Sequence, residues 1–102
     1  MKTKFKTTLQ RHALEGLEEV IVKALQYNAE TDDDKLLLCV LDSILKKIQL
    51  KLLLYKPTYN LKLEHEQAIA LRMLYTDFVQ ENKSYMGAKL HLIANQIHQH
   101  FY

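Results

Sequence analysis

The sequence has little of the residue types that build tight turns, disulfides or glycine-rich loops. Among its 102 residues there are two glycines, one proline, one cysteine and no tryptophan. This composition leaves little material for hairpins and favours long helices with few connections. Because Gly16 and Gly87 lie far apart, the closely spaced glycine motifs that cradle phosphates are excluded.

The single cysteine and the absence of a long apolar run set the expected compartment. Cys39 has no partner for an internal disulfide, which indicates a reducing environment. Its leucine-rich surroundings predict an unreactive thiol. The first ten residues lack the apolar region of a secretory signal, and no apolar run is long enough to span a bilayer. We therefore expect a cytoplasmic protein that does not enter a membrane.

No residue pattern predicts catalysis, a metal or a cofactor. None of the five histidines lie four residues apart, the spacing that places two imidazoles within reach of one ion, and no glutamate has a histidine three residues later. The acidic run Asp32–Asp34 lacks the alternating ligands of a calcium loop and has Leu37 where that loop needs glycine. We expect no catalytic residue, no metal ligand and no cofactor, and hence a protein that is not an enzyme.

Hydrophobic periodicity predicts an all-α fold. Apolar residues recur every three or four positions over four segments. The prediction is one domain over residues 1–102, an antiparallel four-helix bundle with no apparent internal repeat and with helices near 8–28, 32–55, 65–81 and 85–101.

The expected helix starts have capping signals. Thr7 with Gln10 fits a capping box, Thr31 precedes three aspartates, Gln67 stands at the third helical position, and Ser84 precedes the last helix.

A short extended arm is expected between the second and third helices. Pro57 stops the second helix, because proline disfavours helical geometry in the residue before it. Tyr59, Leu61 and Leu63 then alternate with polar residues, the period of a strand. An isolated strand leaves backbone groups unpaired. The arm is therefore expected to cross the bundle or to pair with its copy in a second chain.

The second helix has more apolar surface than its neighbours in a bundle could cover. One stripe from Leu37 to Tyr55 supplies the expected core, yet further apolar residues lie on its other sides. We interpret the surplus as a dimer interface, for which the predicted residues are Leu36, Cys39, Val40, Leu50, Leu53, Leu54, Tyr59 and Leu61. In the alternative reading, the segment after Tyr55 folds back over those leucines.

The charge pattern supplies a second functional hypothesis. The net charge is only +2 and residues 12–34 sum to −6, whereas Lys2, Lys4 and Lys6 occupy a basic N-terminal arm and further lysines lie between Lys46 and Lys62. The first hypothesis is a non-catalytic interaction or structural module that self-associates, with another protein as a further partner. The alternative is a small nucleic-acid-associated regulator that uses the basic arm and the Lys46–Lys62 patch. It is less favoured because leucines interrupt the patch.

Overall fold

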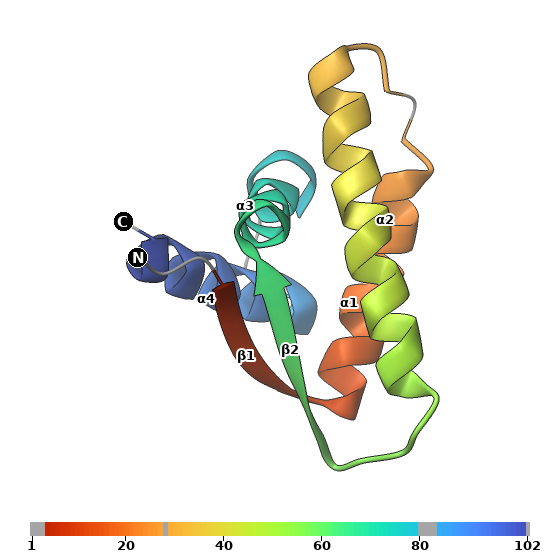
Figure 1. The fold of residues 1–102 in the computed structure, drawn as a ribbon, viewed down its shortest axis with the longest axis vertical. Helices are drawn as coiled ribbons and strands as arrows, with labels where there is room; N and C mark the ends of the chain where they lie inside the picture. The colour runs from red at the N-terminus through yellow and green to blue at the C-terminus, as the bar shows by residue number, and fades with distance from the viewer. Residues whose placement is uncertain (1–3, 28, 80–83, 102) are drawn as a thin grey trace.

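The chain forms four helices and a two-stranded sheet (Figure 1). The computed structural model describes residues 4–27, 29–79 and 84–101. The elements in chain order are β1 (Lys4–Gln10), α1 (Arg11–Leu25), α2 (Asp32–Leu52), β2 (Thr58–Glu64), α3 (His65–Leu74), the π-helical turn η1 (Tyr75–Val79) and α4 (Tyr85–Phe101).

The predicted all-α four-helix bundle is wrong, because β1 and β2 pair as an antiparallel ribbon. The register runs from Lys4 opposite Glu64 to Gln10 opposite Thr58. The extended arm thus pairs with the N-terminal segment of its own chain, neither crossing a bundle nor requiring a second copy. The first helix begins at Arg11 instead of residue 8, and the Thr7–Gln10 capping box does not form. Pairing with β2 satisfies these backbone groups, so the strand is preferred over an extra helical turn.

The other helix boundaries follow from local signals. The Thr31 hydroxyl accepts a hydrogen bond from the backbone N–H of Asp34 at 3.0 Å, and Glu64 and Gln67 form a reciprocal capping box, as predicted. The Ser84 hydroxyl similarly accepts from the N–H of Gly87 at 3.0 Å. Three helix ends differ from expectation: α1 stops at Leu25 instead of near 28, α2 stops at Leu52 instead of 55, and the third helix widens into η1. The expected end at residue 81 lies outside the described residues.

The fold is a strand–helix–helix unit that occurs twice. β1 begins at residue 4 and β2 at 58, a difference of 54 residues. The same difference separates the start of α1 at 11 from that of α3 at 65, and α4 begins 53 residues after α2. Thr7 and Leu61, also 54 residues apart, face each other at the centre of the ribbon. The two units are therefore related by an approximate two-fold axis through this pair. No internal repeat was expected from the sequence, and the repetition lies in the order of the elements.

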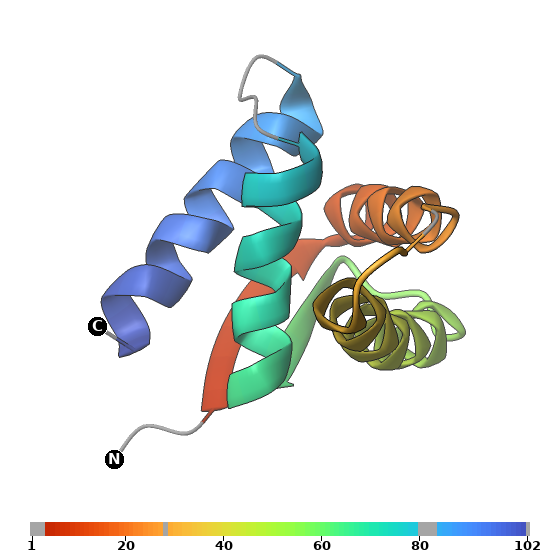
Figure 2. The ribbon, with the colours of Figure 1, turned by 90° about the horizontal axis from the view of Figure 1, so that it is seen from above.

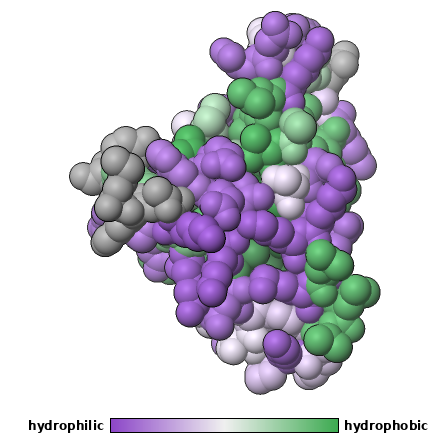
Figure 3. All heavy atoms as spheres, in the orientation of Figure 1, coloured by the Kyte–Doolittle hydropathy of each residue, from purple (hydrophilic) through white to green (hydrophobic). Residues whose placement is uncertain are grey.

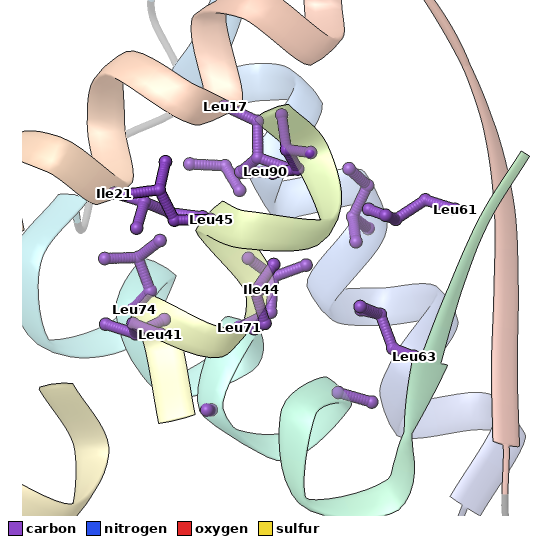
Figure 4. Packing of buried hydrophobic residues seen from close by; sticks show 14 of the residues in the cluster. Leu17, Ile21, Leu41, Ile44, Leu45, Leu61, Leu63, Leu71, Leu74 and Leu90 are labelled. Atoms are coloured by element: carbon purple, nitrogen blue, oxygen red, sulfur yellow. The ribbon is translucent and has the colours of Figure 1, made fainter. Parts of the chain in front are cut away.

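One core joins the two units. α1 packs on α2 and α3 on α4 within the units, while α2 meets α3 and α1 meets α4 across them (Figure 2). Figure 4 shows Ile44 and Leu45 of α2 among leucines from both units, including Leu71 of α3 and Leu61 of β2. Neither unit could bury these side chains alone, so the two fold together.

Gly16 permits a close contact between α1 and α4. A Cβ built on Gly16 would come within 2.5 Å of the Met86 sulfur.

Over the described residues, none of the helices is both long and apolar enough to cross a membrane.

Candidate interaction surfaces

The most unusual surface is the side of α2 that faces away from the core. We define the outer face of α2 by six residues that recur at alternate spacings of three and four: Leu36, Cys39, Ser43, Lys46, Leu50 and Leu53. Leu36, Leu50 and Leu53 are 65%, 68% and 78% exposed. Cys39 is exposed rather than a core residue. The opposite side of the helix is buried among α1, α3 and the ribbon.

Apolar side chains gather at both ends of this face. Figure 3 shows two green areas over α2, one toward its N-terminal half and one at its C-terminal end, with polar surface between them. Next to the outer face, Leu54 is 66% exposed and Val40 is partly buried against the core. Six of the eight predicted interface residues therefore lie on or beside one side of α2.

The other two predicted interface residues lie inside the chain. Tyr59 and Leu61 are 4% and 0% exposed, because alternate residues of β2 point into the core. They pack within the protomer and are not part of the outer face.

A hydrogen-bond cluster fixes the chain direction after α2. The Tyr59 hydroxyl donates to the Leu54 carbonyl at 2.6 Å and accepts from Arg11 at 2.6 Å and from the Lys56 N–H at 3.0 Å. Arg11 also lies 5.1 Å from the centre of the Tyr55 ring. These contacts direct residues 55–57 toward β2 and leave Leu53 and Leu54 exposed, so the connection does not fold back over the leucines.

Removing the Tyr59 hydroxyl should destabilise the fold. In Tyr59→Phe the Leu54 carbonyl and the Arg11 guanidinium lose their buried partner, and we expect a loss of about 2 kcal/mol in the free energy of unfolding. Urea denaturation followed by circular dichroism measures it. The control is Tyr55→Phe, since Tyr55 is 82% exposed and its change should stay within about 0.5 kcal/mol. Equal stabilities of the two variants would contradict the assigned role.

A polar bridge beside α2 separates two surface hollows. The Gln67 carbonyl oxygen accepts from Lys47 Nζ at 2.6 Å and from the Glu64 N–H at 3.0 Å, and its amide donates to the Ser43 hydroxyl at 3.0 Å. On one side is a hollow of about 440 Å³ between α2 and α3 that includes Leu36 and Val40. On the other is a hollow of about 370 Å³ between α2 and β2 that includes Leu50 and Leu54. Both are open to solvent. The first is lined mainly by apolar groups, and the second by polar and apolar groups together.

Gln67 is the one buried polar side chain among the described residues, and it should be required for stability. Gln67→Leu would leave Lys47 and Ser43 without this partner and remove the capping box, so we expect a loss of about 2 kcal/mol in unfolding free energy. The matched control is Gln96→Leu at an exposed position of α4. A Gln67→Leu protein as stable as the control would show that the bridge contributes nothing.

The second surface is the exposed face of the ribbon. It consists of eight polar residues: Lys4, Lys6, Thr8 and Gln10 of β1, and Thr58, Asn60, Lys62 and Glu64 of β2. Lys4 pairs with Glu64 at 3.7 Å, and the Thr8 hydroxyl donates to the Asn60 side-chain oxygen at 2.8 Å. Lys6, however, lies directly opposite Lys62. Like charges at such positions destabilise a sheet, so this exposed pair opposes the pairing of the two strands.

The structure brings no metal-binding cluster together over the described residues. Among them there is no group of three or more histidine, cysteine, aspartate and glutamate side chains that could hold an ion. Several histidines pack on aromatic rings instead: His65 stacks on Phe101 with ring centres 4.5 Å apart, and His12 lies 4.9 Å from the Tyr85 ring.

Sequence reasoning missed the ribbon face because it did not identify β1. The signal was present: Lys4, Lys6 and Thr8 alternate with Phe5, Thr7 and Leu9, the period of a half-buried strand.

No family model, no curated protein and no solved structure matches the chain.

Proposed function

We propose that the chain is a non-catalytic interaction module that self-associates through the outer face of α2. The supporting observation is the exposure of Leu36, Leu50 and Leu53 on one side of a single helix. Fully burying one such side chain is worth about 1.5–3 kcal/mol, so three partly exposed leucines from each of two copies supply on the order of 10 kcal/mol. Association costs are of similar size, about 4–15 kcal/mol. We therefore expect a reversible dimer whose population depends on concentration.

The shape of the surface favours a protein partner over a small molecule. Small-molecule sites are concave and enclose most of the ligand. The outer face of α2 is instead a row of exposed side chains beside two open hollows. Exposed apolar areas bordered by polar residues are typical of protein–protein contacts.

Charges on the leucine positions should dissociate the dimer without unfolding the chain. In Leu50→Glu/Leu54→Glu the carboxylates stay hydrated in the monomer, because both positions are about two-thirds exposed. In the dimer they would have to lose water beside apolar groups. We expect sedimentation velocity to show a shift from dimer to monomer, with an unchanged helical circular dichroism signal.

The control for this experiment is Leu92→Glu, an exposed apolar position on α4, which should leave the dimer intact. Sedimentation of the wild-type chain should be measured up to about 100 μM, a concentration that would reveal even a weak micromolar dimer. A monomer of 12.0 kDa at every concentration would refute self-association.

A second candidate function is nucleic-acid binding, which the ribbon face favours. A two-stranded ribbon fits the major groove of B-DNA, where side chains on its outer face reach base edges and phosphates. The outward residues near the centre of this ribbon are Lys6, Thr8, Asn60 and Lys62, all able to donate hydrogen bonds, and without an acid among them. A phosphate near Lys6 and Lys62 would also relieve their mutual repulsion.

Titration of a fluorescent DNA duplex with the protein at several salt concentrations tests this candidate. Each lost lysine–phosphate contact reduces the slope of log affinity against log salt by about 1, so Lys6→Ala/Lys62→Ala should reduce it by about 2. The control, Lys23→Ala/Lys35→Ala, removes the same charge from exposed positions on α1 and α2 and should change the slope less. Absence of binding by the wild-type protein at low salt would eliminate the candidate.

A further inference from the structure

We infer that the partner of α2 is the α2 helix of a second copy, running in the opposite direction. This inference rests on the proposed self-association and adds its geometry. The six residues of the outer face follow one another at intervals of three, four, three, four and three. This series is the same when read backwards. A two-fold axis midway between Ser43 and Lys46 therefore places each position opposite another position of the same face.

The positions paired in this way are chemically compatible. Leu36 of one copy lies level with Leu53 of the other, and Cys39 lies level with Leu50, so apolar groups meet at both ends. At the centre the polar residues Ser43 and Lys46 lie level with each other. The alternate spacing of three and four is that of two helices packed side by side along a continuous seam.

The charges at the two ends of α2 favour an antiparallel arrangement of the two helices over a parallel one. The first turn of α2 contains Asp32, Asp33 and Asp34, whereas Lys51 lies in its last turn and Lys56 follows the helix. Parallel helices would place aspartates beside aspartates, and Lys46 beside its own copy. Antiparallel helices instead bring the aspartates of one copy toward the end of α2 that carries Lys51 in the other. Opposite charges across an interface favour one orientation and disfavour the other.

The outer face is accessible along its length. Leu36 and Leu53 are separated by 17 residues, or about 26 Å of helix. All six residues are exposed or half-buried. Figure 2, which looks roughly along α2, shows α1 on one side of the helix and α3 with the ribbon on another, leaving the remaining sides open. A second helix can thus lie against the face without displacing any element of the chain.

The native cysteine allows a direct test of orientation. In the antiparallel pair a cysteine at position 50 lies level with Cys39 of the other copy. The two Cys39 residues are then 11 residues apart along the axis, or about 16 Å, beyond the Cα separation of about 4.4–6.8 Å that a disulfide needs. In a parallel pair the two Cys39 residues lie level with each other. Leu50→Cys should therefore form a covalent dimer on mild oxidation, whereas the wild-type chain should not.

The control variant is Cys39→Ser/Leu50→Cys, which keeps the new thiol and removes its expected partner. Non-reducing electrophoresis should show most of the oxidised Leu50→Cys protein as a dimer, and only background amounts for the control and the wild type. A wild-type disulfide through Cys39, or an equal yield from the control, would overturn the antiparallel orientation. Sedimentation of the reduced wild-type protein tests self-association separately: a dimer without the predicted crosslink refutes the orientation alone, and a monomer refutes the proposed function.

Discussion

The pairing of β1 with β2 determines the arrangement of the other elements. Each strand leads without a connecting loop into a helix, at Gln10–Arg11 and at Glu64–His65. Once the strands are hydrogen-bonded, the starts of α1 and α3 are fixed relative to each other. The inward residues of the ribbon then form one wall of the core against which all four helices pack. A two-stranded ribbon is barely stable alone, so the helices stabilise the same pairing that positions them.

The two strand–helix–helix units are similar in plan but present different surfaces. α2 has 21 residues and α4 has 17, and the additional length of α2 carries Leu50 and leads into the exposed leucines that follow. Tyr59 ties this end to the ribbon by donating a hydrogen bond to the Leu54 carbonyl. The ribbon has an apolar inner side and a polar outer side. One framework thus presents two distinct exposed surfaces, the outer face of α2 and the outer side of the ribbon.

Local signals in the sequence were sufficient to predict that helices start at Asp32, His65 and Tyr85. At each of these positions a capping residue and the apolar periodicity indicate the same start. They were insufficient at β1, since Leu9 also continues the helical periodicity of α1 and the partner strand lies more than fifty residues away. The surplus apolar surface of α2 was predictable from composition and spacing. The side of α2 that stays open was not, because it depends on how α1, α3 and the ribbon surround the helix. Tyr59 and Leu61 were assigned to an interface because β1 had not been identified. Without that partner strand, no place in the core was predicted for β2.

The duplication also bears on how the chain could misassemble. Each unit completes its core with the other unit, and the exposed connection of residues 53–57 is the covalent link between α2 and β2. If that connection opened in two chains, the first unit of one could bind the second unit of the other through the same contacts, giving an exchanged dimer. The Arg11, Tyr59 and Lys56 hydrogen bonds bend this connection sharply back toward the ribbon. Their importance therefore extends beyond stability: they keep the two halves of one chain together.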